Sequence, residues 1–263
     1  MIDLQRPRDV GELLSTTFTV FGRRWQVFLP LTFVVVAPVI VLVDGLWGGV
    51  LADGPRVHQP VAAALVSVFL KSTVVPAVVT GLHCVVVAAL GEGRRVGIGE
   101  AISDLVPRLP RAFGAVLLYI GGVGIGLIAL VIPGIWVAIR WYFSVQAAVL
   151  ERCRPAAAIN RSGDLVDGSW WRVLGLWLAM SLITGLLVAP ASGASFGDSG
   201  MLWVAANVLA QTLALSLTAI YGTLMFFDLR ARQGAAAADP GEPWAAREFT
   251  RTQWLPPQPP PVA

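Results

Sequence analysis

Long apolar blocks with almost no charged residues constrain this chain more than any other feature of its sequence. A helix needs about 20 consecutive, mostly apolar residues to cross the hydrocarbon core of a bilayer. Such blocks recur along most of the 263 residues, of which 56% are hydrophobic and only 13% are charged. A soluble domain normally carries about 25% charged residues. The sequence therefore predicts an all-α, polytopic membrane protein.

Six blocks are long enough to cross a bilayer. Their approximate bounds are residues 25–50, 60–90, 113–132, 135–150, 171–189 and 201–227. Only Pro133 and Gly134 separate the third block from the fourth. This pair predicts a sharp reversal, because proline removes a backbone donor and glycine permits a tight turn. We therefore expect six transmembrane helices arranged as three hairpins.

The arginines near the ends of these blocks are distributed unevenly. Loops on the cytoplasmic side of a membrane carry an excess of Arg and Lys. If successive blocks cross the membrane in alternate directions, one side of the membrane carries Arg6, Arg8, Arg23, Arg24, Arg94, Arg95, Arg108, Arg111, Arg152, Arg154, Arg161, Arg172, Arg230, Arg232, Arg247 and Arg251. The other side carries only Arg56. The asymmetry predicts an even number of spans, with the N-terminus and the C-terminus both in the cytoplasm.

The cellular location follows from composition and from the first residues. An Arg- and Ala-rich, Lys-poor composition is typical of GC-rich bacterial genomes, so we expect the bacterial cytoplasmic membrane. Residues 1–24 are polar and of mixed charge, unlike a cleaved signal peptide. We therefore expect the first span to act as the targeting signal.

A short amphipathic segment precedes each predicted hairpin and suggests an internal repeat. Gly, Glu, Ser, Arg and an aromatic residue recur at the same offsets in residues 11–25 and 99–113, and residues 157–172 form a looser third copy. Such a segment fits a helix lying in the cytoplasmic interface, followed by a basic and aromatic anchor. The alternative is that any membrane hairpin needs such flanks. The repeat divides the membrane domain, residues 1–232, into units of about 1–95, 96–153 and 154–232.

The remainder of the chain, residues 233–263, differs in composition from the membrane domain. It begins with a run of alanines and ends in a proline-rich segment, which is too polar and too proline-rich to pack a core. We expect a disordered or polyproline II tail in the cytoplasm. The tail and the cytoplasmic segments are the places where we expect protein partners.

One group of motifs resembles a known family. The motifs are Val-Ile-Pro-Gly-Ile-Trp at residues 131–136, Arg140-Trp141, Arg161-Ser162, Trp-Trp-Arg-Val at residues 170–173, Arg6-Pro7 and Asp228-Leu229-Arg230. Together they resemble bacterial proteins of the glycerophosphoryl diester phosphodiesterase membrane domain family, over about residues 6–232. In some members of that family a fused soluble barrel carries the catalytic residues and the metal site. This chain has no room for such a barrel, so the resemblance implies a membrane protein without phosphodiesterase activity.

Charged residues inside the predicted spans are the first candidates for a site, because charges are costly in a membrane. Asp44, Lys71 and Arg140 all fall in the outer half of their predicted spans. They are candidates for one polar pocket that binds an anionic group such as a lipid phosphate, which guanidinium recognises through two hydrogen bonds. The alternatives are a structural ion pair, or cationic side chains that extend to the interface.

Other polar and small residues favour structural roles. Gly122 and Gly126 are four residues apart, a spacing that lets helices approach closely in lipid. His58 and His83 lack clustered Cys or carboxylate partners, so we expect no metal site. No pattern of a nucleophile with its base is present, and we expect neither a cofactor nor an enzyme.

The sequence leaves two functional hypotheses. The first is a non-enzymatic scaffold or regulatory component of the membrane. The alternative is a transporter or lipid-handling protein that binds an anionic group in an outer-leaflet pocket, since repeats and helix-breaking prolines also occur in transporters. Under both hypotheses membrane lipids are partners and nucleic acid is not, while the oligomeric state stays open.

Overall fold

Every regular element that the structure describes is helical, which confirms the predicted all-α class for this part of the chain. The computed structural model describes residues 4, 6–53, 60–192 and 199–237. The elements are α1 (Val10–Val39), η1 (Ile40–Trp47), α2 (Val50–Asp53), α3 (Val61–Phe69), η2 (Leu70–Val74), α4 (Val75–Gly91), α5 (Ile98–Leu105), η3 (Val106–Arg108), α6 (Leu109–Ala129), α7 (Val131–Arg140), α8 (Ser144–Leu150), α9 (Pro155–Val166), α10 (Trp170–Ser192) and α11 (Gly200–Ala237).

Five continuous helical stretches in the described residues are long and apolar enough to cross a membrane, which makes the chain a multi-pass membrane protein. They are Val10–Trp47, Val61–Gly91, Ile98–Ala129, Trp170–Ala191 and Gly200–Gly234. These stretches contain the first, second, third, fifth and sixth predicted spans, apart from a few residues at their ends. The described residues therefore do not show the six predicted transmembrane helices.

The fourth predicted span, residues 135–150, is not one helix in the structure. The helix α7 ends at Arg140, a turn follows, and α8 begins only at Ser144. A side chain of α9 stabilises this turn. The backbone N–H of Phe143 donates to the Ser162 hydroxyl at 3.0 Å, and the same hydroxyl donates to the Arg140 carbonyl at 2.9 Å. Hydropathy along the chain carries no information about this bond to α9, and so the break was not predicted.

The reversal between α6 and α7 lies earlier than the Pro133-Gly134 pair. Leu130 has an extended backbone, with φ of −167° and ψ of 150°, and Pro133 falls in the first turn of α7, where a helix needs no N–H donor. Gly134 instead permits close packing. A Cβ atom built on Gly126 would lie only 2.9 Å from the Cα of Gly134. This contact confirms the predicted packing role of Gly126.

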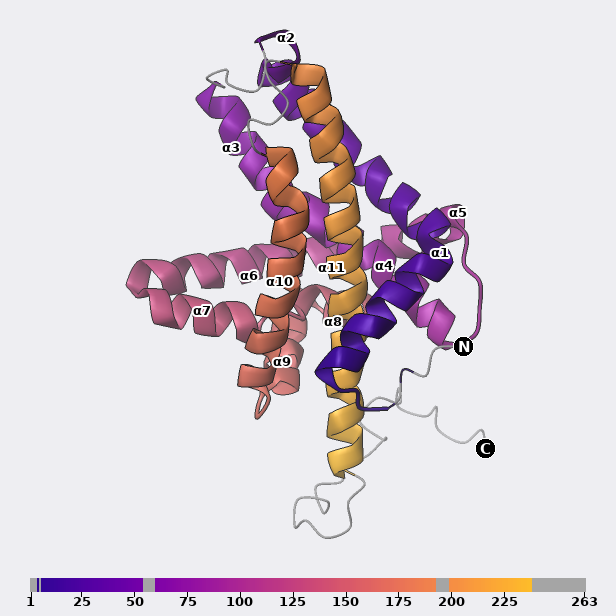
Figure 1. The fold of residues 1–263 in the computed structure, drawn as a ribbon. Coiled ribbons are helices and arrows are strands. Elements are labelled where there is room, and N and C mark those ends of the chain that lie inside the picture. The colour runs from indigo at the N-terminus through magenta and orange to yellow at the C-terminus, as the bar shows by residue number, and fades with distance from the viewer. Residues whose placement is uncertain (1–3, 5, 54–59, 193–198, 238–263) are drawn as a thin grey trace, which may run out of the picture.

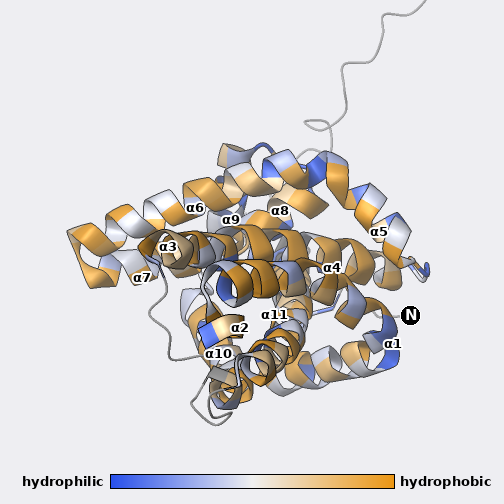
Figure 2. Ribbon diagram, turned by 90° about the horizontal axis from the view of Figure 1, so that it is seen from above, coloured by the Kyte–Doolittle hydropathy of each residue, from blue (hydrophilic) through white to orange (hydrophobic). Residues whose placement is uncertain are grey.

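The helix α11 forms the centre of the molecule, and α1, α4 and α10 pack against it. In Figure 1, α10 and α11 lie side by side and run in opposite directions, whereas α6 and α7 form a hairpin that extends sideways. Figure 2 looks down on this arrangement and shows α6 and α7 projecting from the bundle, with mostly hydrophobic residues. The largest fully buried side chains include Tyr221, Phe28, Phe143 and Phe226.

Helices also occur where the interfacial segments were predicted. Within α1, Arg24 has a non-helical backbone with φ of −136° and ψ of 23°, so the helix kinks next to the predicted start of the first span. The helices α5 and α9 cover the other two segments. At the far end, α11 continues through residues 233–237, which were assigned to the tail, and the rest of the tail lies outside the described residues.

Candidate functional site

Asp44 and Lys71, two of the three predicted site residues, form an ion pair. Asp44 is 2% exposed, and its Oδ1 accepts a hydrogen bond of 2.6 Å from the Ser67 hydroxyl, while Lys71 contacts the other oxygen. The Lys71 side chain keeps 29% of its surface exposed. The buried carboxylate thus has a hydroxyl donor at one oxygen and a cation beside the other, and the pair joins the first and second candidate spans. It is the structural ion pair that was weighed as the alternative to a binding pocket.

Both members of this pair lie in widened helical turns. Asp44 belongs to η1 and Lys71 to η2, and both segments have π-helical geometry within otherwise α-helical stretches. Such segments are rare and often occur at functional positions, because the extra residue per turn redirects side chains. Here they carry the two members of the Asp44–Lys71 ion pair.

Arg140 lies elsewhere, so the three candidate residues do not share a pocket. As the last residue of α7 it packs against α9, with its Nη1 3.6 Å from a carboxylate oxygen of Asp167, and its guanidinium lies 5.1 Å from the centre of the Trp136 ring. In Figure 1, α2 and α3, which neighbour η1, lie at the top of the molecule, whereas α7 and α9 lie in its lower half. The separation follows from the missing fourth span, which would have carried Arg140 along the bundle.

A cavity of about 390 Å³ lies beside the first part of α1, at the arginine-rich end of the molecule. Its lining is strongly cationic and rich in hydroxyl groups. It consists of Arg6, Arg8, Glu12, Ser15, Thr16, Thr19, Val20, Arg23, Arg24 and Leu90. The spacing of Glu12, Ser15, Thr16, Thr19 and Arg23 places them on one face of a helix, because residues three and four apart are neighbours there.

The acidic residue in this lining is already engaged. Glu12 forms an ion pair and a hydrogen bond with Arg6 across the mouth of the cavity. The kink at Arg24 turns the chain away immediately after the cavity and places Arg23 and Arg24 at its edge. The lining therefore contains four arginine residues and a single acidic residue.

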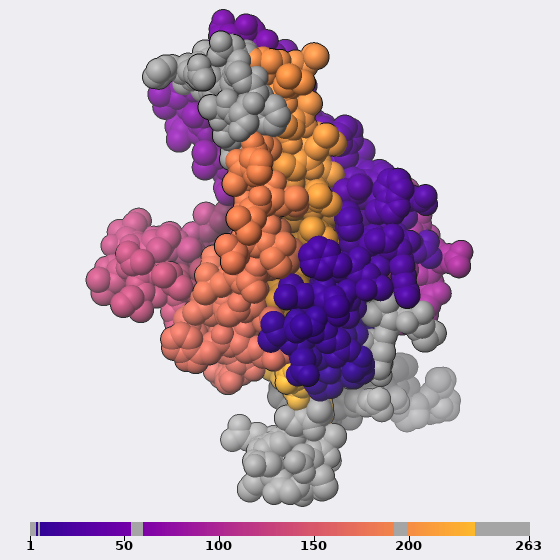
Figure 3. All heavy atoms as spheres, viewed as in Figure 1, coloured from indigo at the N-terminus to yellow at the C-terminus, as the bar shows by residue number. Residues whose placement is uncertain are grey.

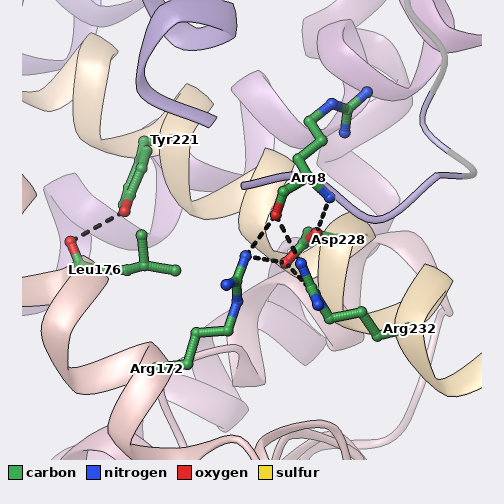
Figure 4. A network of polar contacts seen from close by, with 6 residues as sticks. All are labelled: Arg8, Arg172, Leu176, Tyr221, Asp228 and Arg232. Carbon is green, nitrogen blue, oxygen red and sulfur yellow. Dashed lines mark hydrogen bonds and ion pairs between the residues drawn. The ribbon is translucent and has the colours of Figure 1, made fainter. Parts of the chain in front are cut away.

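The wall that carries Arg8 is fixed by a buried carboxylate. Asp228 on α11 is 0% exposed, and one of its oxygens accepts a hydrogen bond of 2.6 Å from the backbone N–H of Arg8. Its other oxygen accepts from Arg172 at 3.2 Å and from Arg232 at 3.1 Å. Figure 4 shows these side chains converging from the N-terminal segment, α10 and α11. We call this group, Arg8, Arg172, Asp228 and Arg232, the Asp228 cluster.

The Asp228 cluster is closed by bonds to the backbone. The Arg8 carbonyl accepts hydrogen bonds from Arg172 at 2.6 Å and from Arg232 at 2.7 Å. Nearby, the Tyr221 hydroxyl donates to the carbonyl of Leu176 at 3.0 Å, which adds a second link between α10 and α11 (Figure 4). The N-terminal segment is thus tied to the ends of two candidate spans, and the position of the cavity is set by that attachment.

Sequence reasoning did not single out the cavity or the Asp228 cluster. Each of their arginines was assigned to the excess on the cytoplasmic side, which explains orientation and does not predict contacts. One local signal was present, because Asp228 precedes Arg232 by four residues, a spacing at which opposite charges on a helix meet. The bonds to Arg8 and Arg172 join positions more than fifty residues apart in the chain and needed the tertiary structure.

Two other buried polar side chains, Asn207 and His83, bond to backbone carbonyls. The amide of Asn207 on α11 donates to the carbonyl of Ala191 on α10 at 2.7 Å. His83 is buried, stacks on Phe28 and bonds through Nδ1 to the Val79 carbonyl at 2.8 Å. His58 lies outside the described residues. Within those residues, no group of three or more His, Cys, Asp or Glu side chains is placed to hold a metal ion.

Comparison of the chain with protein-family models, with curated proteins and with solved structures finds no match. Any functional conclusion must therefore come from the geometry of the chain itself.

Proposed function

We propose that this multi-pass protein is a non-enzymatic component of the bacterial cytoplasmic membrane, and that it scaffolds or regulates partners there while its arginine-lined cavity holds the phosphate of an anionic lipid headgroup. The observation that supports the proposal is the cavity beside the first part of α1, with its four arginines and three hydroxyl groups. Both termini are proposed to be cytoplasmic, which places this cavity at the inner leaflet.

The lining has the chemistry that phosphate needs. A guanidinium donates two parallel hydrogen bonds to phosphate oxygens, and a charge-assisted hydrogen bond is about twice as strong as a neutral one. The Ser15 and Thr19 hydroxyls donate to the backbone carbonyls of Glu12 and Ser15 at 3.1 and 2.8 Å, and the Thr16 hydroxyl lies on the same face of α1. Basic residues at the cytoplasmic surface are also attracted to anionic lipids, by about 1 kcal/mol for each residue near the surface.

The outer-leaflet pocket receives less support than the cavity. Lys71 is already paired with the buried Asp44, and Arg140 pairs with Asp167 elsewhere in the molecule. We therefore prefer the scaffold with a lipid-binding cavity to the transporter, and we keep Arg140, Lys71 and Asp44 as structural residues in this proposal. The resemblance to the glycerophosphoryl diester phosphodiesterase membrane domain family is retained as a proposal, and it too implies a role without hydrolysis.

Lipid binding by the purified full-length protein tests the proposal. We expect a short-chain phosphatidylglycerol to bind more tightly than the matching phosphatidylcholine, as measured by titration in detergent above its micelle concentration. The double variant Arg23→Gln/Arg24→Gln removes two guanidinium groups from the cavity. Since a hydrogen bond to a charged group contributes about 1.5–3 kcal/mol, the loss of affinity is expected to exceed tenfold, about 1.4 kcal/mol.

A second arginine pair supplies a matched control. Arg94 and Arg95 are adjacent, exposed and outside the cavity, so Arg94→Gln/Arg95→Gln makes the same change of charge at a different place. We expect this variant to bind phosphatidylglycerol like the wild type. Equal weakening by both double variants would show a general attraction of charge and would refute the cavity as the site. Inorganic phosphate binding as tightly as the lipid would assign the cavity to a soluble phosphate group instead.

A further inference from the structure

The direction of the α6–α7 hairpin differs from that of the other candidate spans. Figure 1 shows α10 and α11 along one axis and the hairpin running across that axis, and the view from above in Figure 2 shows α6 along its full length. Helices that cross the bilayer together are tilted by about 20° on average from the membrane normal. A helix that is nearly perpendicular to α10 and α11 cannot cross the same bilayer beside them.

The returning arm of the hairpin is also too short to cross. The helix α7 contains 10 residues, from Val131 to Arg140. At 1.5 Å per residue it is about 15 Å long, roughly half of the 30 Å hydrocarbon core. Apolar helices of this length occur as re-entrant or interfacial segments. The returning arm therefore covers about half the thickness of the hydrocarbon core before the helix ends at Arg140.

The free end of the hairpin exposes apolar side chains on all sides. Ile125, Ile128, Leu130, Val131 and Ile132 are 63% to 88% exposed. Residues 113–139 contain no charged side chain. In the space-filling view of Figure 3 this end stands out from the body as a separate lobe. An apolar, uncharged lobe of this kind matches acyl chains and is mismatched with water.

The base of the hairpin has the polar and aromatic character of a membrane interface. The Trp170 indole donates to the carbonyl of Trp136 at 3.3 Å, and Arg140 stacks on the Trp136 ring. Trp and Arg side chains favour the headgroup level. On the other arm, Arg108 and Arg111 immediately precede the apolar part of α6. Both arms thus have basic and aromatic residues at the base of the hairpin and apolar residues at its free end.

We infer that the α6–α7 hairpin is a re-entrant element, which lies within the cytoplasmic leaflet along the membrane plane and does not cross the bilayer. Four stretches then cross: α1 with η1, α3 to α4, α10, and α11. This number is even, so both termini and every arginine-rich segment stay on one side, as the asymmetry requires. The inference rests on the membrane location and on the proposed cytoplasmic orientation, and it is independent of the lipid-binding cavity.

Nitroxide labels on single cysteines test the inference in proteoliposomes. The background is Cys153→Ser, in which Cys84 remains as a fully buried and unreactive thiol. Labels are placed at Leu117 and Ile128, both exposed on α6, with Leu182 on α10 as the hydrocarbon reference and Ser103 on α5 as the water reference. Accessibility to oxygen and to a water-soluble nickel complex then gives the depth of each label.

A re-entrant hairpin gives both α6 labels the same depth, with high accessibility to oxygen and low accessibility to nickel, as at Leu182. A crossing helix instead separates them in depth by about 16 Å, because the two positions are eleven residues apart and each residue adds about 1.5 Å, and that result would overturn the inference. Nickel accessibility equal to that at Ser103 would place the hairpin in water. Spin–spin broadening that disappears on dilution with unlabelled protein would show a second copy covering the lobe.

An impermeant maleimide applied to intact cells supplies an independent measurement. We expect no reaction with Ile128→Cys, whereas Ala52→Cys, an exposed position on α2 at the opposite end of the bundle, reacts readily. If Ile128→Cys reacts like Ala52→Cys, the hairpin crosses the membrane and the inference is wrong. Ile125→Cys, also exposed near the free end, serves as a second variant if Ile128→Cys fails to fold.

Discussion

Replacing Asp228 by Asn tests the attachment that holds the arginine-rich end together. The substitution keeps the size of the side chain and removes its charge. An amide oxygen can still accept the hydrogen bond from the Arg8 N–H, but the amide nitrogen then faces the donors of Arg172 and Arg232. Both guanidinium groups lose their carboxylate partner while their bonds to the Arg8 carbonyl remain.

The expected cost follows from these two lost bonds. A hydrogen bond to a charged group contributes about 1.5–3 kcal/mol, so two bonds give about 3–6 kcal/mol. The Arg172 and Arg232 side chains keep 25% and 35% of their surface exposed, so water replaces part of the lost interaction. We therefore expect Asp228→Asn to lower the free energy of unfolding by about 2–4 kcal/mol.

Unfolding by SDS in mixed micelles measures this change. Asp164→Asn is the matched control, because Asp164 is an exposed carboxylate on α9 near the same end of the molecule. Limited trypsin digestion adds a local readout, since release of the N-terminal segment exposes the bond after Arg8. If Asp228→Asn and Asp164→Asn unfold at the same SDS concentration and are cleaved equally slowly, the proposed role of the Asp228 cluster is refuted.

Three further predictions concern packing, the buried ion pair and a thiol. Gly126→Val is expected to destabilise the protein by about 1–3 kcal/mol, because a Cβ atom at Gly126 meets the Gly134 backbone. Gly124→Val is the control, because a Cβ atom at Gly124 meets nothing within 4 Å. Equal unfolding midpoints of the two variants would contradict the prediction. Lys71→Met leaves the buried Asp44 carboxylate without its cation and is expected to destabilise the protein. The double variant Lys71→Met/Asp44→Leu removes the unpaired charge and should unfold at a higher SDS concentration than Lys71→Met. If the double variant regains no stability, the ion pair is unimportant. Burial raises the pKa of the Cys153 thiol and the Glu151 carboxylate raises it further, so little thiolate exists at neutral pH and alkylation should accelerate only as the pH rises. Glu151→Gln lowers the pKa of Cys153 and should increase its rate of reaction with iodoacetamide at neutral pH, and an unchanged rate would exclude this electrostatic effect.

Much of the fold was predictable because the membrane imposes its requirements locally along the chain. The length and apolar character of a span are properties of consecutive residues, and five such stretches were located correctly. The basic and aromatic step was predicted as the start of the first span, and the structure places the kink of α1 there, at Arg24. The hairpin reversal was misplaced by a few residues, because Pro133 fits the first turn of a helix as well as it fits a turn.

The candidate site was predicted only in part. A lone carboxylate and a lone ammonium in neighbouring spans suggested the Asp44–Lys71 pair, which the structure contains. Arg140 was assigned to the same pocket on the assumption that residues 135–150 form one straight helix. That assumption is wrong, because a turn stabilised by the Ser162 hydroxyl ends α7 at Arg140, and Arg140 lies beside Asp167.

The sequence by itself determined that the chain is a helical membrane protein, because the hydrophobic effect acts on runs of neighbouring side chains. It also determined the uneven distribution of arginines, from which the predicted orientation follows. Only the tertiary structure decided which arginines gather around a cavity, how Asp228 holds the N-terminal segment, and in which direction α6 and α7 run. These features depend on contacts between residues that are distant in the chain, and the energy of such contacts leaves no periodic trace in the sequence.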